Sequence, residues 1–276
     1  MEQRATNYHA RALSRGLEIL RTLRGSDDGI TLAELHERTG HAKSTLVRLL
    51  GVLEEEGFVL RIDERPSWTL GFAVIDLARD RLDAVGVPAL ARPLLSALAA
   101  ETGATCNLGV LDGRAVLHVY VEEPDRPLRF RATTGSRDDT YCTGLGKLLL
   151  AYRDEERLGE HLPAREPYER RTEHTLVTRP RLVADLVKTR ERGYSFDDEE
   201  GATGVRCLAV PLRSDGDCVA ALSTAGAASE LAPAEHERIL GHLHATAQRI
   251  EANPALINAL RITARSLSPA DFATTS

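Results

Sequence analysis

The first part of the chain is dominated by leucines at helical spacing. Leu13, Leu17, Leu20 and Leu23 recur every three or four residues and predict an amphipathic helix over 11–24. A Gly-Ser-Asp-Asp-Gly segment follows and reads as a loop. The spacing therefore places one helix before the first turn.

Two further helices follow before any strand. Thr31 with Glu34 has the spacing of a capping box, which predicts a short helix that stops at Gly40. A third helix is predicted from about 42 to 56, with Gly57 as its stop. Its apolar stripe consists of Leu46, Leu49, Leu50 and Leu53.

Strand-like runs then appear around a turn. Residues 58–62 and 68–70 are separated by turn-forming residues, which predicts a two-stranded wing. Residues 72–86 return to helical periodicity, and Pro88 interrupts the run before another helix. A helical linker is therefore expected after the wing.

From Thr105 onward the pattern favours strands interrupted by helices. Asp112-Gly113 and Asp215-Gly216 have the chemistry of hairpin turns. Together these features predict an α+β fold on an antiparallel sheet, and a loose tail over Leu267–Ser276. Strands are expected at 105–111, 115–121, 127–133, 205–213 and 217–225, and helices at 144–153, 179–192 and 233–251.

Composition limits the class of protein. The 276 residues suit two domains, and 42% hydrophobic with 28% charged residues is ordinary for a folded globular chain. No apolar run is long enough for a membrane span and no signal-peptide stretch appears, so we expect a cytoplasmic protein without a membrane partner. The four cysteines are widely spaced without a CxxC, which predicts reduced thiols.

Charge gives no support to nucleic-acid binding. The net charge is −6, and residues 1–75 carry ten Lys/Arg against eleven Asp/Glu. Phosphate neutralisation needs clustered cations, so any basic surface has to be confined to one face. A DNA-binding interpretation depends on pattern alone.

The third helix has such a face. At about 100° per residue, Ser44, Arg48 and Gly51 lie nearly opposite Leu46 and Leu50. A polar helix face in isolation is usually only solvated. Here a short capped helix, a turn, a longer helix and a wing occur in the order of a winged helix-turn-helix, which favours a recognition helix.

Each candidate DNA contact has a chemical reason. Arg48 suits guanine in the major groove, and Lys43 with the positive helix end attracts phosphate. Ser44 and Thr45 would bond bases or phosphates. Arg61 and Arg65 in the wing would contact the backbone or the minor groove. Operator DNA is thus the expected macromolecular partner.

A glycine-rich segment, Tyr141–Lys147, is predicted to open a helix in the second domain. Its glycines allow backbone amides at the positive helix end to approach an anion, and a tight packed turn is an equally open interpretation. The spacing is not that of a nucleotide P-loop.

Other chemistry-bearing groups form no recognisable catalytic or metal set. The acids in 196–204, a predicted polar loop, lack paired histidines and favour solvated or capping roles over a metal. A cysteine enzyme remains an alternative, with Cys142 or Cys207 as nucleophile beside His118 or another histidine. A third interpretation takes the winged helix as a protein-interaction module. We predict no catalytic residue, metal or cofactor.

Several segments, in this order, resemble the IclR family of bacterial transcriptional regulators over about residues 11–250. They are Ser14–Leu20, Lys43–Leu50 with Gly57-Phe58, Trp68–Gly71, Cys142–Lys147, Gly193–Glu200 and Gly204–Ala209.

The resemblance implies a winged helix-turn-helix, a linker helix and a GAF-like effector domain, assembled as a homodimer or a dimer of dimers on palindromic operators. It also implies control by a small organic or aromatic acid. The implied domains are 1–71 for DNA binding, 72–87 as linker, 88–254 for effector binding and oligomerisation, and 255–276 as a C-terminal extension.

In members that bind small carboxylates, the backbone amides of the Gly-Leu step receive the carboxylate. A second pocket serine of those members is replaced by Ala225 here, which implies a less polar or differently shaped pocket. The matching pocket positions are Gly144, Leu145, Asp197, Cys207 and Ser223.

Overall fold

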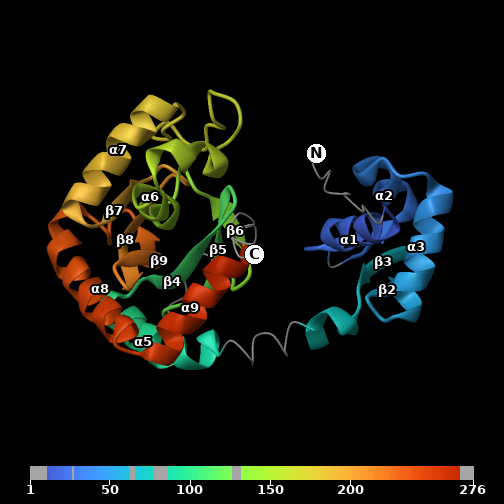
Figure 1. Ribbon diagram of the computed structural model, residues 1–276, viewed down its shortest axis with the longest axis horizontal. Coiled ribbons are helices and arrows are strands. Elements are labelled where there is room, and N and C mark those ends of the chain that lie inside the picture. Colours follow the sequence, from blue (N-terminus) through green and yellow to red (C-terminus); the bar gives the residue numbers. More distant parts are fainter. Residues whose placement is uncertain (1–10, 27, 63–65, 78–85, 126–131, 268–276) are drawn as a thin grey trace, which may run out of the picture. The chain divides into compact units, whose positions relative to one another are not determined.

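A computed structural model of the protein (Figure 1) describes residues 11–26, 28–62, 66–77, 86–125 and 132–267. The chain divides into two compact units, Met1–Ala84 and Val85–Ser276. Each unit has its own hydrophobic core. Residues 72–77 are helical, as predicted for the linker, whereas 78–85 lie outside the described residues.

The first unit is a winged helix-turn-helix. Its small sheet is antiparallel, in the order β1-β3-β2, so the wing has three strands where the sequence predicted two. The added strand is only two residues long, too short to show alternation. The elements are α1 (Arg11–Leu23), β1 (Ile30–Thr31), α2 (Leu32–Thr39), α3 (Lys43–Glu55), β2 (Val59–Ile62) and β3 (Ser67–Leu70).

Local chemistry fixes the turn between α2 and α3. The Thr31 amide donates to Glu34 Oε2 at 2.8 Å, and the Glu34 amide donates to Thr31 Oγ1 at 3.4 Å, so the predicted capping box is confirmed. Gly40 ends α2 with φ 69°, a left-handed conformation that favours glycine. The chain can therefore reverse direction within a few residues and start α3.

Only part of the leucine stripe of α1 faces the core. Ile19 and Leu23 are buried against α2 and α3, whereas Leu13 and Leu17 are 64% and 43% exposed. Helical spacing identifies a stripe but not which neighbour covers it. Here Leu13 and Leu17 border a groove, and Leu23 belongs to the core.

The second unit is built on one antiparallel sheet of six strands, in the order β6-β5-β4-β9-β8-β7. Helices α5, α8 and α9 cover one face and α6 lies on the other, with α7 beside it (Figure 1). The elements are α5 (Val87–Thr102), β4 (Thr105–Asp112), β5 (Ala115–Glu122), β6 (Arg137–Asp139), α6 (Gly144–Ala151), η1 (Glu155–His161), α7 (Arg179–Arg192), β7 (Ser195–Asp198), β8 (Val205–Ser214), β9 (Asp217–Ala227), η2 (Pro233–Glu235), α8 (His236–Glu251) and α9 (Pro254–Leu267).

The predicted elements of this unit lie where expected, with exceptions. Asp215 and Gly216 both have positive φ, 54° and 90°, as a two-residue hairpin turn requires. Residues 196–198, predicted as loop, belong to β7, because pairing with β8 overrides their acidic composition. The predicted strand 127–133 lies mostly outside the described residues.

The C-terminal region contributes to the core. Helix α9, for which the sequence analysis predicted no element, buries Leu256 and Leu260 against α5 and the sheet. The predicted tail begins at the last residue of this helix, and 268–276 lie outside the described residues. The apolar face of the sheet is thus closed by three helices, and the polar pocket lies on the opposite side.

Candidate functional site

The polar face of α3 is exposed in the structure. Lys43, Ser44, Arg48 and Gly51 are exposed, and Thr45 is half-buried at the edge of the face. Leu46 and Leu50, on the opposite side, are buried, so the core fixes which face points outward. The structure therefore brings the five polar and glycine positions of the predicted face onto one solvent-facing surface.

The start of α3 favours anions. The N-cap, Ala42, has no side-chain cap, and no acid lies in the first turn. Lys43 therefore adds a side-chain cation at this end, and the helix dipole adds partial positive charge there. Such an end attracts phosphate.

One of the two predicted DNA contacts of the wing lies within the described residues. Arg61 lies on β2, exposed, with its guanidinium 5.8 Å from the Trp68 ring centroid. The stacking limits the rotamers of the arginine, since a guanidinium over an indole is attracted to it. Arg65, the other predicted wing contact, lies outside the described residues.

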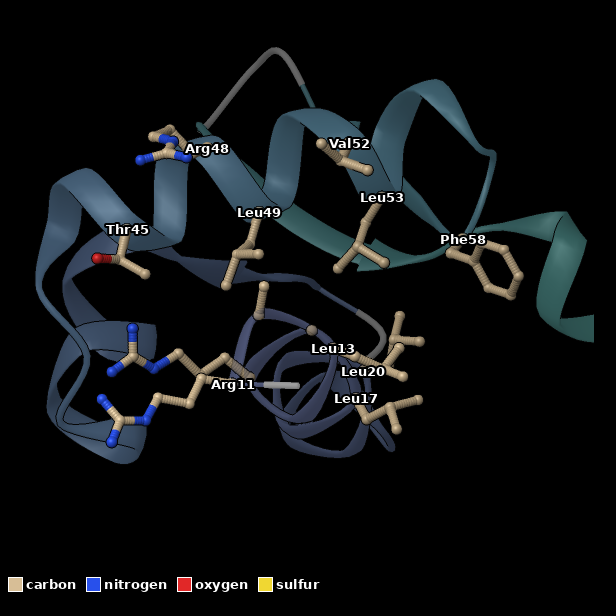
Figure 2. A pocket seen from close by; sticks show the side chains of 13 residues that line it. Arg11, Leu13, Leu17, Leu20, Thr45, Arg48, Leu49, Val52, Leu53 and Phe58 are labelled. Carbon is tan, nitrogen blue, oxygen red and sulfur yellow. The ribbon is translucent and has the colours of Figure 1, made fainter. Parts of the chain in front are cut away.

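A groove of about 720 Å³ separates α1 from α3. Thr45, Arg48 and Arg11 lie toward one end, and Phe58 lies at the other (Figure 2). Apart from Arg15, the remaining walls are apolar, and exposed leucines of α1 form part of them. These walls include Leu13, Leu17, Leu20, Leu49, Val52 and Leu53.

The second unit contains a pocket of about 310 Å³ between the sheet and the start of α6. It is near the lower end of the volumes typical of ligand sites, roughly 300–1,000 Å³. The structure brings together all five residues that the sequence analysis assigned to an effector. Gly144, Leu145, Asp197, Cys207 and Ser223 line it, together with Ala225.

The glycine-rich start of α6 contains a tight turn and also borders the pocket. Gly146 is packed so closely on the Thr140 backbone that a Cβ would overlap it, so part of the motif is a tight turn. Thr143 caps the helix by accepting the Gly146 amide at 3.2 Å. The step between them, Gly144-Leu145, borders the pocket at the positive end of the helix.

Cys207 lies directly behind Gly144. A Cβ on Gly144 would come within 2.6 Å of the Cys207 sulfur, so only glycine fits here. Burial raises the pKa of the Cys207 thiol to about 12, although hydrogen bonds from Ser223 and the Gly144 amide oppose the shift. Burial likewise raises the pKa of Cys142 to about 12. Both thiols stay protonated near neutral pH, which is the opposite of an activated nucleophile.

Asp197 is a buried acid in the pocket. Its Oδ1 accepts the Glu200 amide at 2.8 Å. Burial raises its pKa to about 7, against the opposing effects of backbone hydrogen bonds and Lys147. The side chain therefore exchanges its proton close to neutral pH, and a solvated role for this acid is wrong.

Glu200 is also buried, in an ion-pair cluster around Lys147. The Lys147 ammonium contacts Glu200, lies 2.9 Å from Asp185 Oδ2 and donates to the Phe196 carbonyl at 2.6 Å. Burial alone would lower the pKa of Lys147, but the two carboxylates outweigh it and raise the pKa. The cluster ties α6 to α7 and to the loop after β7, so a solvated role for Glu200 is wrong too.

The other two acids of this segment have a different partner. Arg206 on β8 lies 2.7 Å from Asp198 and 3.6 Å from Glu199. Glu199 also accepts the Gly204 amide at 2.7 Å. The four consecutive acids thus serve three separate purposes, because the strand and the turn direct them to different sides.

Several polar side chains of the pocket were not assigned to it from the sequence. Asn107 lies on β4, His118 on β5 and Asp138 on β6, and all three line the pocket. Ala225 removes one hydroxyl group, but these side chains add other polar groups to the pocket. The available signal was alternation: Asn107 falls on the same face of its strand as Thr105, and its register partner is Ser223.

No helix of the parts of the chain that the structure describes is long and apolar enough to cross a membrane.

Two family models match the chain. Residues 12–63 match the IclR helix-turn-helix domain, and residues 80–252 match the model for the C-terminal part of the bacterial transcriptional regulator IclR.

Individual proteins agree with these matches. The transcriptional repressor IclR of Escherichia coli is 33% identical over 223 residues, which cover 80% of this chain and 81% of that protein. The crystal structure of a transcriptional regulator of this kind from Alicyclobacillus acidocaldarius has a TM-score of 0.77 and 27% identity, covering 89% of this chain and 99% of its own. An IclR homolog of Microbacterium hydrocarbonoxydans, complexed with 4-hydroxybenzoate, has a TM-score of 0.73 and 22% identity, covering 91% and 99%.

Proposed function

The chain belongs to the IclR family of bacterial DNA-binding transcriptional regulators, and from that premise we propose that it binds a palindromic operator under the control of a small organic acid. The observation that carries the DNA part is the exposed polar face of α3 above a buried leucine core. The observation that carries the sensing part is the pocket at the start of α6.

On DNA, α3 would enter the major groove. Arg48 would read guanine, since its guanidinium matches the O6 and N7 acceptors. Lys43 at the helix start would hold phosphate, and Ser44 with Thr45 would bond bases or phosphates. Arg61, and Arg65 if it follows the same wing, would contact the backbone or the minor groove.

A palindrome follows from symmetry. One reading face recognises one half-site, and two copies related by a two-fold axis recognise two half-sites in opposite orientation. We therefore propose a homodimer, or a dimer of dimers, as the unit that binds DNA.

The effector would place its carboxylate at the Gly144-Leu145 amides. Sulfur is a weak acceptor, so a carboxylate would compete well with Cys207 for the Gly144 amide. The pocket volume of about 310 Å³ suits a molecule of the size of a small aromatic or aliphatic acid. A bound 4-hydroxybenzoate in the Microbacterium relative is consistent with this class.

Binding would act through populations. An acid that fits one arrangement of the DNA-reading units better than another shifts the equilibrium toward it by that difference in affinity. The same difference sets how strongly DNA, in return, changes the affinity for the acid.

Selection of bound fragments from the source genome tests the operator. We expect enrichment of an inverted repeat, and steep loss of affinity with salt because phosphate contacts release counterions. Enrichment of no repeated sequence would contradict the proposal. Salt-independent binding would instead favour a protein-interaction role for the winged helix.

The sensing half is tested on the full-length protein with a thermal-shift panel of organic acids, since a ligand stabilises by RT ln(1 + [L]/Kd). Acids that raise the Tm should also change the affinity for the selected operator. Effector control would be contradicted if every acid that raises the Tm leaves the operator affinity unchanged.

A further inference from the structure

Two residues that line the pocket, Asn107 and His118, each have a buried side-chain atom without a hydrogen-bond partner among the described residues, Oδ1 and Nδ1 respectively. We propose that they form a subsite for a hydrogen-bond donor on the ligand, so that the effector is a small monocarboxylic acid that also carries a hydroxyl or amino group. The inference rests on the proposed function, because it takes the carboxylate to lie at Gly144-Leu145.

The orientation of Asn107 follows from its neighbours. Its Nδ2 lies 3.4 Å from the Thr105 carbonyl oxygen and 3.4 Å from Ser223 Oγ. A carbonyl oxygen only accepts, so the amide nitrogen has to face Thr105. The remaining group, Oδ1, is therefore an acceptor, and the side chain is only 3% exposed.

The tautomer of His118 follows in the same way. Its Nε2 lies 2.8 Å from Asp138 Oδ2, and a carboxylate only accepts, so Nε2 carries the hydrogen. In the neutral ring, Nδ1 is then an acceptor. His118 is 4% exposed, which leaves this atom little access to water.

The two acceptors and the α6 amides belong to one site. Asn107 and Gly109 lie on the same face of β4, and His118 is paired with Gly109 on the neighbouring strand. A Cβ on Gly109 would come within 2.9 Å of Leu145 Cδ1, so the Leu145 side chain covers that position. Glycine at 109 therefore lets the residue that offers its amide to the carboxylate sit beside the two acceptors.

Charge decides what kind of second group fits. The described residues that line the pocket include the acids Asp138 and Asp197 but no lysine or arginine. A second anionic group would be repelled by these two carboxylates. An unpaired buried acceptor is unfavourable, so a ligand donor that pairs with it gains affinity. A neutral hydroxyl or an amine meets both conditions, and a dicarboxylate or a phosphorylated acid does not.

Matched acids test the subsite in the full-length protein by calorimetry. The probes are benzoate, 4-methoxybenzoate, 3- and 4-hydroxybenzoate and 4-aminobenzoate, with propanoate and lactate as a smaller pair. We expect a donor-bearing acid to bind roughly 5–100-fold more tightly than its parent. The methoxy compound, which keeps the oxygen but loses the donor, should show no gain, and the hydroxy and amino compounds tell the two donors apart.

Asn107→Leu and His118→Phe should each bring the ratio between donor-bearing and parent acid close to one. His244→Phe, at an exposed position on α8, is the matched control and should keep the wild-type ratio. Circular dichroism melting checks that each variant folds. If one does not, the comparison of hydroxy and methoxy acids on the wild type still decides.

The outcomes separate the two proposals. Parent acids that bind as tightly as their donor-bearing partners overturn the subsite and leave acid sensing intact. A preference that survives in both folded variants also overturns it. If no acid of the panel binds, both the subsite and acid sensing fail.

Discussion

The DNA-reading unit and the sensing unit place their functional groups in opposite environments. On α3 the polar groups are exposed and make no contribution to the core, which consists of apolar side chains behind them. In the second unit most of the polar groups, Asn107, His118, Lys147, Asp197, Glu200 and Ser223 among them, are buried. The pKa of Asp197 and that of Lys147 are both raised by their surroundings.

This difference separates stability from function in one unit and couples them in the other. An exposed side chain can be exchanged with little effect on the free energy of unfolding. A buried polar group that loses its partner leaves a desolvated charge or an unpaired bond. Substitutions should therefore give clean binding phenotypes on α3, and mixed phenotypes around the pocket.

Lys147→Met should have the largest effect. It removes the cation between the half-buried Asp185 and the buried Glu200 and leaves both carboxylates unpaired, which costs about 3–5 kcal/mol in the free energy of unfolding. Urea unfolding of the effector-free protein measures it. A Lys147→Met/Glu200→Gln double variant should recover part of the loss, since one uncompensated charge is gone. Equal stability of the single variant and wild type would show that the cluster is not a buried ion pair in solution.

Arg48→Ala should leave stability within about 0.5 kcal/mol, because the side chain is exposed. It should reduce discrimination between operator and random DNA by about 1–3 kcal/mol. Fluorescence anisotropy titrations with both DNAs measure this. Lys43→Ala is the contrasting variant, with a similar loss on both DNAs and a salt slope lower by about 1. A similar loss on both DNAs for Arg48→Ala would reassign Arg48 to phosphate.

Asp197 should make acid binding depend on pH. Its pKa is about 7 in the free protein, and a bound anion raises it further, because like charges disfavour ionisation. Below pH 7 the Asp197 carboxyl group is already protonated in the free protein. Above pH 7 binding has to take up a proton, so affinity should fall about tenfold per pH unit.

Calorimetry between pH 6 and 9 measures this slope. Asp197→Asn should remove it, whereas Asp217→Asn, an exposed control on β9, should retain it. An affinity that rises with pH, or a slope that persists in Asp197→Asn, would show that another group takes up the proton.

The two units could be predicted from the sequence to different extents, because their interactions span different distances along the chain. The capping box at Thr31, the stop at Gly40 and the polar face through Ser44 and Arg48 depend on residues within a few turns of one another, and the structure has them as predicted. Which leucines of the first helix are covered could not be predicted in the same way, and Leu13 is exposed, because another element decides what covers a helix.

The pocket depended on long-range pairing. Asn107 meets Ser223 across 116 positions, and His118 meets Asp138 only because β5 pairs with β6, a strand of three residues without alternation. The resemblance to the IclR family identified the residues at which we expect the effector's carboxylate to bind. It did not locate the acceptors, since they depend on the register of this chain's own strands.

Substitution of Gly51 should have the smallest effect of the changes considered. A Cβ at Gly51 would have no atom within 4 Å, unlike at Gly144, so Gly51→Ala should stabilise α3 by about 0.5–1 kcal/mol. If glycine is there to let DNA approach, the same variant should bind the operator more weakly. Gly241→Ala on α8, also exposed with no atom within 4 Å, should give the same gain in urea unfolding without a change in DNA affinity. Unchanged operator affinity in Gly51→Ala would place the DNA further from this turn of α3 than we propose.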